Sequence, residues 1–273
     1  MRLIICVNAR YFLTLCLKQV NTIKIMSNSK RAIVMGATSG IGREVAILLS
    51  QNGYDVAVAG RREELLKTLV NDNESIIDYQ IIDITSDDAT VQLANLIERI
   101  GGIDLYFHSS GIGYQNLKLD SENELRTVET NAVGFTRIIN NVYHYFVKRG
   151  SGQIAAITSI AGTKGLGAAP AYSATKRFQN SYLEALSQLS RMKGVDITFT
   201  DIRPGFVATD LLGDGATYPM KMNKHYVAKK VVNAVLRRRK VVVVDWRYAI
   251  LVFFWRLVPR CIWTRMKISS MKE

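Results

Sequence analysis

Ser159, Tyr172 and Lys176 have side chains that can act together in proton transfer, and they lie in one short part of the chain. Tyr172 and Lys176 are four residues apart, so on a helix they would share one face. A nearby ammonium group favours the phenolate and lowers the pKa of a tyrosine from its usual value of about 10. The sequence therefore predicts that Tyr172 exchanges a proton with a carbonyl or alcohol oxygen that the Ser159 hydroxyl also holds.

Two predicted elements position these residues. Residues 153–158 form an apolar run, which predicts a strand that ends beside Ser159. Residues 171–189 contain no glycine or proline and few β-branched residues, which predicts a helix that begins close to Tyr172. A tyrosine and a lysine at this spacing also occur in helices that carry out no chemistry. The interpretation therefore depends on the other motifs of the chain.

A glycine-rich turn follows the first predicted strand, residues 31–35. Gly36, Gly40 and Gly42 belong to this turn, and helical spacing begins directly afterwards, over residues 43–51. A strand, a glycine turn and a helix in this order form the context of a phosphate-binding loop. Glycines let the backbone approach a pyrophosphate closely, and the N-terminus of the helix attracts its negative charge. We therefore expect a dinucleotide to bind at this turn.

The second predicted strand, residues 54–59, is followed by Arg61 and Arg62 and not by an acidic residue. In dinucleotide-binding folds an acidic residue at this place holds the ribose 2′-hydroxyl, whereas an arginine accommodates a 2′-phosphate. The two arginines therefore favour NADP (NADPH) over NAD. The alternative is that they only lead into the next predicted helix, residues 63–70.

Strands and helices alternate along the remainder of the body. The other predicted strands are residues 76–82, 103–107, 195–202 and 241–244. The other predicted helices are residues 87–100, 122–130, 134–148 and 227–239. This alternation predicts an α/β, Rossmann-type doubly wound parallel sheet of about seven strands with helices on both faces. Ligands of such sheets bind beyond the carboxyl ends of the strands, so we expect the candidate residues to converge at that edge.

Together these motifs resemble the short-chain dehydrogenase/reductase family over roughly residues 31–245. The residues that carry the resemblance are Gly36, Gly40, Ile41, Gly42, Asp83, Ser110, Gly111, Asn131, Ser159, Tyr172, Lys176, Pro204 and Gly205. The resemblance implies that Tyr172 is the proton donor or acceptor and that Ser159 orients the substrate oxygen. It also implies that Lys176 tunes Tyr172 and binds the nicotinamide ribose, while Asn131 helps to hold a water for proton relay.

The resemblance further implies a nicotinamide cofactor, with Asp83 and Ile84 near the adenine and the turn after residue 203 over the nicotinamide. The predicted cofactor-binding residues are Gly36, Thr38, Ser39, Gly40, Ile41, Gly42, Arg61, Arg62, Asp83, Ile84, Ser110, Gly111, Tyr172, Lys176, Pro204, Gly205, Val207 and Thr209. No metal site is expected. By analogy with the family, the helices on either side of Asn131 would pack between subunits of a homodimer or homotetramer.

The chain departs from the family pattern at two places. Met35 stands where the family usually has threonine, and residues 108–111 read His-Ser-Ser-Gly where it usually has Asn-Asn-Ala-Gly. We expect these differences to alter local packing and to leave the chemistry intact. We expect His108 to have a structural role; the alternative is that it is an additional proton-transfer group.

Apolar residues predict the character of the substrate. Residues 211–222 are expected to form a flap over it, with Leu211, Leu212, Tyr218, Met220 and Met222. The opposite side is expected to be an apolar shelf of Leu166, Ala168 and Ala169. An apolar flap and shelf favour a hydrophobic or lipid-like substrate. The alternative, to which we give equal weight, is that these residues pack in the protein core and do not contact a substrate.

The two ends of the chain are basic, whereas the body is mildly acidic. Residues 1–31 contain six Lys or Arg and no acid, and residues 228–273 contain twelve Lys or Arg against two acids. A nucleic-acid binder would spread its basic residues over a docking face, so this class is disfavoured. Basic ends fit an anionic membrane surface or a solvated tail. The cysteines, Cys6, Cys16 and Cys261, lie outside the body and suit a reducing, cytoplasmic compartment.

Both ends allow several interpretations. We interpret residues 1–30 as a leader and suggest that translation begins at Met26, with a weak amphipathic membrane contact as the alternative. Residues 31–245 would form the Rossmann domain. Residues 246–273 form a tail in which Trp, Phe and Arg mix, which suits a membrane interface on the inner face, a subunit contact or a lid over the site.

The sequence as a whole predicts an NADP-dependent oxidoreductase that reduces a ketone to an alcohol. The alternatives are a sensor that binds NADP without chemistry and a scaffold of the same fold at a membrane. A sensor would not need Asn131, Ser159, Tyr172 and Lys176 together, and the chain has all four.

Overall fold

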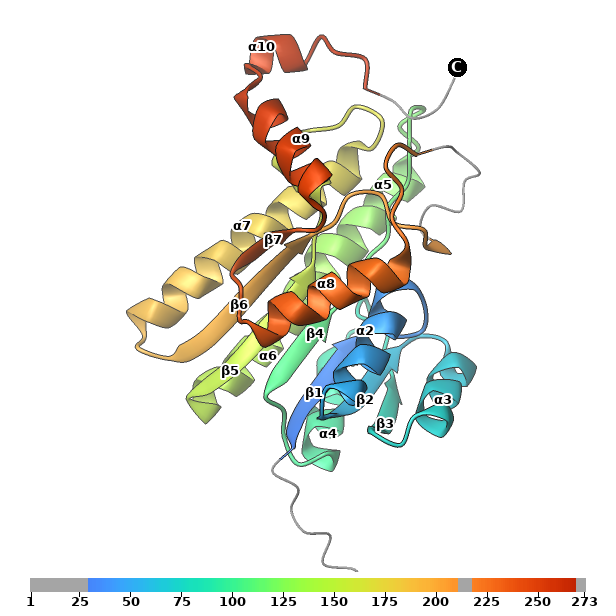
Figure 1. Ribbon diagram of the computed structural model, residues 1–273, viewed down its shortest axis with the longest axis vertical. Helices are drawn as coiled ribbons and strands as arrows, with labels where there is room; N and C mark the ends of the chain where they lie inside the picture. The colour runs from blue at the N-terminus through green and yellow to red at the C-terminus, as the bar shows by residue number, and fades with distance from the viewer. Residues whose placement is uncertain (1–28, 211–217, 269–273) are drawn as a thin grey trace, which may run out of the picture.

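Seven parallel strands form a single sheet in the order β3-β2-β1-β4-β5-β6-β7 (Figure 1). The computed structural model describes residues 29–210 and 218–268. The strands are β1 (Lys30–Met35), β2 (Tyr54–Gly60), β3 (Ile76–Ile81), β4 (Leu105–His108), β5 (Ser151–Ile157), β6 (Asp196–Arg203) and β7 (Val241–Val243). The predicted doubly wound parallel sheet is confirmed. The strand order reverses between β1 and β4, and a ligand crevice of such a sheet lies at this point.

Helices cover both faces of the sheet. Buried side chains of α2 (Gly40–Gln51), α3 (Glu63–Asp72) and α8 (Lys224–Leu236) pack in the core on one face. Those of α4 (Ala89–Arg99), α6 (Phe135–Arg149) and α7 (Pro170–Met192) pack in the core on the other face. Because both faces are covered, the central strands β1, β4 and β5 are runs of buried, mainly apolar residues without polar alternation.

The chain around Asn131 is one continuous helical run and not the two helices that were predicted. α5 (Ser121–Val128) passes into a π-helical turn, Glu129–Gly134, and then directly into α6. π-turns inside helices occur frequently at functional sites. A Cβ atom at Gly134 would lie 2.8 Å from the Ile84 carbonyl oxygen, so glycine lets this turn approach the segment after β3 closely. Asn131 lies in the turn and is buried.

Two helices follow β7 at one end of the molecule. α9 (Trp246–Leu257) and α10 (Arg260–Trp263) are separated at Pro259. Tyr248 and Val252 of α9 belong to the core that also contains α8, so the predicted tail begins inside the packed body. Within residues 29–210 and 218–268 no helix has the length and apolar character needed to cross a membrane.

Candidate active site

Two features at the start of α7 hold Tyr172 in the first turn. Pro170 lies in the first turn, where a backbone N–H would have no partner within the helix, so the missing N–H of proline costs no hydrogen bond. The Glu124 carboxylate of α5 accepts a hydrogen bond from the Ala171 N–H at 3.0 Å, so a negative charge lies at the positive end of the helix. The Tyr172 ring lies against Gly113, where a Cβ atom would be 2.4 Å from Tyr172 Cδ2. These contacts fix the start of α7 and place the Tyr172 ring against Gly113.

Ser159 follows β5 and faces Tyr172. Its hydroxyl oxygen accepts a hydrogen bond from the Ala161 N–H at 3.0 Å, which caps the short 3₁₀ turn Ile160–Thr163 (η2). The hydroxyl also forms a hydrogen bond with Tyr172, which favours the phenolate. Ser159 and Tyr172 can thus both reach one oxygen atom of a substrate.

Lys176 lies one turn further along α7 and is buried. Its Nζ donates hydrogen bonds to the Ile157 carbonyl oxygen at 3.1 Å and to Gln179 Oε1 at 3.0 Å. The Nζ atom is 5.8 Å from the centroid of the Tyr172 ring. A Cβ atom at Gly111 would lie 3.4 Å from this Nζ and 3.2 Å from Asn131 Oδ1. Gly111 therefore leaves the space between Lys176 and Asn131 open.

The predicted effect of Lys176 on Tyr172 differs from what the structure shows. Burial raises the pKa of Tyr172 above its usual value, and the hydrogen bond with Ser159 only partly opposes this rise. Burial also lowers the pKa of Lys176 to about 8, although the Asp201 carboxylate acts in the opposite direction. The reason is that desolvation penalises the charged form of both groups. Tyr172 is therefore protonated at neutral pH and is not a phenolate.

Gln179, which the sequence analysis did not single out, connects Lys176 to Asn131. Its Nε2 donates to the Asn131 main-chain oxygen at 2.8 Å, while its Oε1 accepts from Lys176. The Asn131 side chain is held by Ile112, accepting from its N–H at 2.9 Å and donating to its carbonyl oxygen at 2.7 Å. Gln179 thus bridges the Lys176 ammonium and the Asn131 main chain. The available signal was the spacing, because Gln179 is three residues from Lys176 and shares its helix face.

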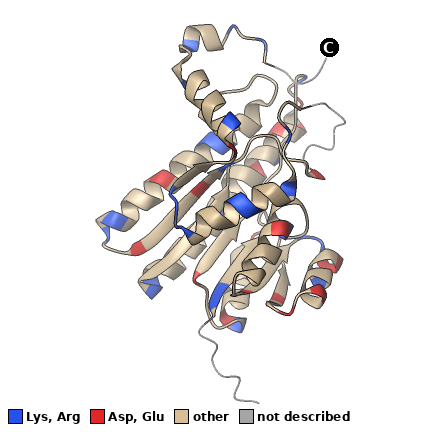
Figure 2. Cartoon of the chain, in the orientation of Figure 1, with Lys and Arg blue, Asp and Glu red and all other residues tan. Residues whose placement is uncertain are grey.

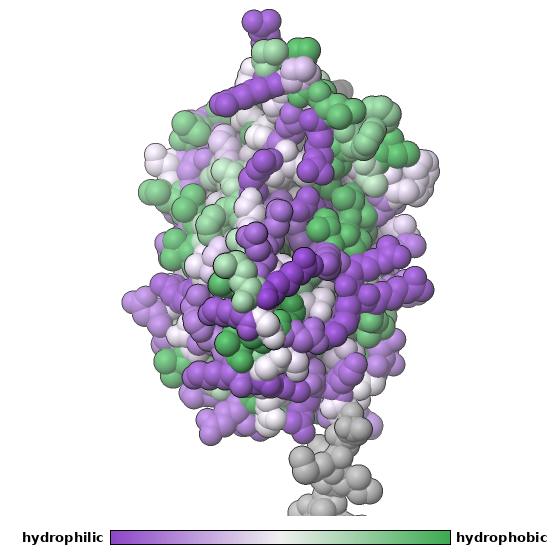
Figure 3. All heavy atoms as spheres, turned by 90° about the vertical axis from the view of Figure 1, so that its left-hand side faces the viewer, coloured by the Kyte–Doolittle hydropathy of each residue, from purple (hydrophilic) through white to green (hydrophobic). Residues whose placement is uncertain are grey.

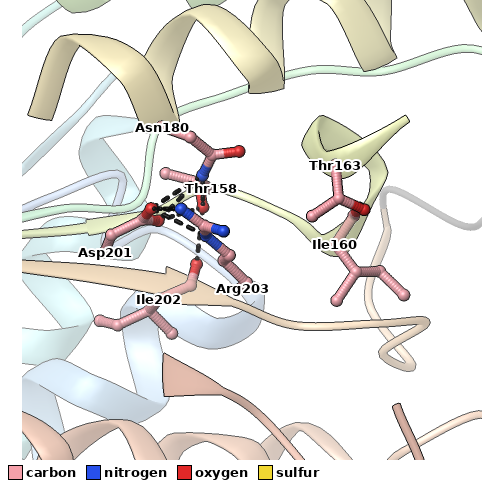
Figure 4. A network of polar contacts seen from close by, with 7 residues as sticks. All are labelled: Thr158, Ile160, Thr163, Asn180, Asp201, Ile202 and Arg203. Atoms are coloured by element: carbon pink, nitrogen blue, oxygen red, sulfur yellow. Dashed lines mark hydrogen bonds and ion pairs between the residues drawn. The ribbon is translucent and has the colours of Figure 1, made fainter. Parts of the chain in front are cut away.

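A buried polar network behind Ser159 and Lys176 was also missed (Figure 4). Asp201 of β6 accepts hydrogen bonds from Thr158 and from Asn180 of α7, the latter at 3.0 Å and 2.9 Å to its two oxygens. The Arg203 guanidinium donates two further bonds to Asp201 Oδ2, at 2.8 Å and 2.6 Å. The network fastens the end of β5 to β6 and α7. It therefore positions the residues on either side of the catalytic candidates.

The glycine turn has the close approaches that a phosphate loop requires. Gly36 has a φ of +83°, and a Cβ atom there would lie 2.7 Å from the Ser110 nitrogen. A Cβ atom at Gly42 would lie 2.2 Å from the Gly36 carbonyl oxygen. Thr209 lies over the same turn, because a Cβ atom at Gly40 would meet its Cγ2 at 3.3 Å. The glycine turn, the Ser110–Gly111 segment and the segment after β6 thus meet at one edge.

The two arginines after β2 differ in their contacts. The Arg62 guanidinium crosses the glycine turn and donates to Thr38 Oγ1 at 2.7 Å and to Ser39 Oγ at 2.7 Å. The Arg61 guanidinium lies 4.0 Å from the Asp83 carboxylate. Asp83 also accepts two hydrogen bonds from Thr85, which lower the pKa of its carboxyl group against the opposing effect of burial. Arginine side chains therefore lie beside the predicted adenosine half of the site.

His108 is fully buried at the end of β4. Its Nδ1 lies 3.1 Å from the Tyr106 hydroxyl. Burial and the charge of Lys176 lower the pKa of His108 to about 3, so the imidazole is neutral over the physiological range. This agrees with the expected structural role.

The segment after β6 is fixed by Tyr248 of α9. A Cβ atom at Gly205 would lie 2.3 Å from the Tyr248 ring, so the backbone passes directly over the ring. The Tyr248 hydroxyl accepts from the Phe206 N–H at 3.1 Å and donates to the Pro219 carbonyl oxygen at 2.9 Å. Of the expected flap, residues 211–217 lie outside the described residues. Tyr218 and Met222 are buried.

Replacing Tyr248 with phenylalanine is expected to lower the free energy of unfolding by about 1–3 kcal/mol, because it leaves the Phe206 N–H without its acceptor. The same change should raise KM more than it lowers kcat, since the hydroxyl also holds the segment after β6, in which Thr209 lies beside the glycine turn. Thermal melting and steady-state kinetics check both effects. Tyr226→Phe, at an exposed tyrosine of α8, is the matched control and should alter neither. An equal effect of both variants contradicts the role of Tyr248.

Most of the predicted site residues meet at the carboxyl edge of the sheet. Gly111, Asn131, Tyr172 and Lys176 are in contact or nearly so, and Ser159 hydrogen-bonds to Tyr172. The glycine turn lies beside them through the contact of Gly36 with Ser110. Their individual roles stay predictions at this point.

Comparison with known proteins shows the family to which the chain belongs. The sequence profile described as short chain dehydrogenase matches residues 30–217. An uncharacterized oxidoreductase of Myxococcus xanthus is 30% identical over 228 residues, which are 81% of this chain and 89% of that protein. Dehydrogenase/reductase SDR family member 7B of Xenopus tropicalis is 27% identical over 266 residues, or 88% of this chain and 85% of that protein. The chain therefore belongs to the short chain dehydrogenase family.

Solved structures show the same fold. An actinorhodin polyketide ketoreductase variant with NADPH is 27% identical, with a TM-score of 0.68 over 80% of this chain and 96% of that one. A short chain dehydrogenase/reductase of Burkholderia phymatum in complex with NAD is 18% identical, with a TM-score of 0.78 over 90% of this chain and 98% of that one. Because the Burkholderia phymatum protein is only 18% identical, its similarity to this chain shows the fold alone.

Proposed function

We propose that this chain is an NADP-dependent oxidoreductase that reduces a ketone to an alcohol. The observation that carries the proposal is the meeting of Ser159, Tyr172 and Lys176 beside the glycine turn, in a chain of this family. The ketoreductase with NADPH supports a carbonyl substrate and this cofactor. The proposed catalytic residues are Asn131, Ser159, Tyr172 and Lys176.

When bound, the nicotinamide would supply the hydride to the carbonyl carbon. The Ser159 hydroxyl donates a hydrogen bond to the carbonyl oxygen and holds it beside Tyr172. Because burial raises the pKa of Tyr172, its hydroxyl is protonated at neutral pH and can give its proton to the oxygen as negative charge develops there. The Lys176 ammonium lies near enough to stabilise the phenolate that remains. Gln179 keeps this ammonium in place.

The glycine turn has the close backbone approaches needed to hold the cofactor pyrophosphate. Arg61 and Arg62 would bind the 2′-phosphate, with Thr38 and Ser39 nearby, and Asp83 and Ile84 would contact the adenine. The turn from Pro204 to Thr209 would cover the nicotinamide. The apolar residues Leu166, Ala168 and Ala169 favour a hydrophobic ketone as substrate.

Changing Arg62 to alanine is expected to weaken NADPH binding about 10- to 100-fold and to leave NADH binding within about twofold, because a charge-assisted hydrogen bond contributes about 1.5–3 kcal/mol. Dissociation constants from the quenching of protein fluorescence check this difference. Arg43→Ala, at an arginine of α2, is the control. Equal losses for the two cofactors would show that Arg62 only supports the glycine turn through Thr38 and Ser39.

The pKa of Lys176 leads to an expected pH dependence. Below about pH 8 the ammonium is charged and can stabilise the Tyr172 phenolate, and above this pH it loses its proton. The kcat/KM for ketone reduction should therefore be level at lower pH and fall above about pH 8. Profiles of the wild type and of Lys176→Arg test this, since arginine keeps its charge to higher pH. A fall at the same pH in both proteins would contradict the assignment to Lys176.

The experiment that tests the proposed function follows NADPH oxidation against ketones of graded chain length and against polar carbonyl compounds. We expect the turnover rate to rise with the chain length of the ketone. We also expect the rate with NADH to be lower than the rate with NADPH. Preference for polar compounds would overturn the substrate class. Tight NADPH binding with no turnover in the whole panel would favour the sensor.

We also propose that the protein acts as a cytoplasmic homo-oligomer through α5 and α6. Leu125, Val128 and Val133 are exposed apolar residues in and beside α5. Their exposure fits a surface that a second subunit covers. Multi-angle light scattering measures the molar mass, and a monomer at working concentration would contradict this proposal.

A further inference from the structure

Helix α9 has two apolar faces. Tyr248, Val252 and Trp255 pack against the body of the protein. The opposite side carries five large apolar residues that are between 48% and 70% exposed. These five, which we call the outer stripe, are Trp246, Ile250, Phe253, Phe254 and Leu257. No other described helix exposes so many large apolar side chains.

The outer stripe follows helical geometry. Its members occur at positions i, i+4, i+7, i+8 and i+11 from Trp246, which is the spacing of a single helix face. On the same helix Arg247 and Arg256 lie at the two sides of the stripe, because each residue turns the helix by about 100°. The apolar residues Tyr248, Val252 and Trp255 of the inner face hide this order in the sequence, and the folded helix separates the two faces. The stripe is thus continuous and has basic borders.

All charged residues of α9, of α10 and of the chain that follows them up to residue 268 are basic. Residues 246–268 contain Arg247, Arg256, Arg260, Arg265 and Lys267 and no acidic residue. Figure 2 shows the same absence of acidic residues along α9 and α10. Arg247 pairs with Asp245, and the other four form no ion pair within the described chain. Figure 3 shows hydrophobic and hydrophilic residues interleaved at the upper end of the molecule, where Figure 1 places these helices.

We propose that the outer stripe docks on an anionic membrane surface. Aromatic and aliphatic side chains enter the boundary between headgroups and acyl chains, while the arginines and Lys267 meet the lipid phosphates. A second copy of this chain is the less suitable occupant, because an interface that pairs two such surfaces would bring two wholly basic segments together. Charge complementarity therefore favours the lipid.

Docking would bring the membrane close to the candidate site. Trp255 Nε1 donates to Thr163 Oγ1 at 2.7 Å, and Trp263 Nε1 donates to the Gly165 carbonyl oxygen at 2.7 Å. Lys164 Nζ donates to the Val258 carbonyl oxygen at 2.8 Å. These bonds tie α9 and α10 to the segment that joins Ser159 to Tyr172.

A groove of about 540 Å³ opens along this segment and the first turns of α7. It is lined by Lys164, Gly165, Leu166, Gly167, Pro170, Ser173, Ala174 and Arg177. A protein docked through the outer stripe would therefore hold this groove near the lipid surface. The inference goes beyond the proposed function, because docking needs neither cofactor nor turnover.

The test is co-sedimentation of the full chain with vesicles of phosphatidylcholine alone and of phosphatidylcholine with an equal part of phosphatidylserine. We expect binding to the anionic vesicles and little to the neutral ones. The double variant Phe253→Ser/Phe254→Ser should bind at least about tenfold more weakly, because its apolar area is lost. Arg256→Ala and Arg260→Ala should each weaken binding about fivefold. Truncation at residue 245 is unsuitable, because it removes Tyr248 from the core.

The matched control is Leu65→Ser/Val91→Ser, which changes two exposed apolar residues of α3 and α4. It should bind the anionic vesicles as the wild type does, and thermal melting should show that both double variants are folded. Equal binding of the wild type to the two kinds of vesicle overturns the proposal. Unchanged vesicle binding of the Phe253→Ser/Phe254→Ser variant also overturns it. If that variant binds vesicles as the wild type does but has a lower molar mass by light scattering, the outer stripe contacts a second copy of the chain.

Discussion

Replacing Tyr172 with phenylalanine is expected to lower kcat/KM for ketone reduction by about 10²–10⁴-fold, the range that a positioned acid contributes. The loss should fall on kcat, because the hydroxyl gives its proton only as charge develops on the substrate oxygen. The ring is retained and still fills the space against Gly113, so folding and NADPH binding should change little. Single-turnover kinetics and NADPH titration measure the two effects separately.

Tyr182→Phe is the matched control for this variant. Tyr182 lies on the same helix, and its ring stacks on Phe178 at 5.6 Å between centroids. Tyr182 is not part of the candidate site, so removing its hydroxyl group should leave kcat unchanged. If Tyr172→Phe keeps its turnover, or if both variants lose the same amount, Tyr172 is not the proton donor and the proposed function fails.

Local signals in the sequence were sufficient for the fold. Apolar runs such as residues 31–35 predict buried strands, and Gly36, Gly53 and Gly150, all with positive φ, mark places where the chain turns between elements. These signals depend on neighbouring residues and on the hydrophobic period, so they are visible without tertiary contacts. The start of α8 was placed late, although Asn223 accepts hydrogen bonds from the His225 and Tyr226 N–H groups and marks that start.

The candidate site was only partly visible in the sequence. Ser159, Tyr172 and Lys176 could be found because their spacing is fixed by one strand and one helix. The only signal for Gln179 was its spacing of three residues from Lys176. Asp201 could not be found, because its role arises from contacts of β6 with the end of β5 and with α7. The pKa of Tyr172 was predicted in the wrong direction for the same reason. The spacing of Tyr172 and Lys176 indicates how near the ammonium lies, but burial decides the direction in which the pKa of Tyr172 shifts. Burial is a property of the whole fold.

The C-terminal helices show a related limit of sequence patterns. A hydropathy pattern records apolar residues on both sides of α9 but does not distinguish the side packed on the core from the side in solvent. Tyr248 is nearly inaccessible, whereas Trp246, two residues earlier, is 70% exposed. Only the docking of the helix on the body separates the two faces, and this separation makes the outer stripe recognisable.

Replacing Asp201 with asparagine is expected to be the most destabilising of the variants considered, because it leaves the largely buried Arg203 guanidinium without its counter-charge. Breaking a buried pair from one side costs about 3–5 kcal/mol. For a domain of this size each kcal/mol lowers Tm by roughly 2–4 °C. Asparagine has nearly the same shape as aspartate, so the loss reports on charge and not on packing. Thermal melting at neutral pH measures it.

The same variant separates structural from electrostatic roles of Asp201. The carboxylate raises the pKa of Lys176 against the larger effect of burial, so its removal should move the fall in kcat/KM from about pH 8 to lower pH. Asp196→Asn is the control, because Asp196 lies on the same strand and forms an exposed ion pair with Arg238. Exposed pairs contribute at most about 1 kcal/mol, and Asp196 is remote from Lys176. A loss of stability in Asp201→Asn without any movement of the pH profile would mean that the network only holds β5, β6 and α7 together.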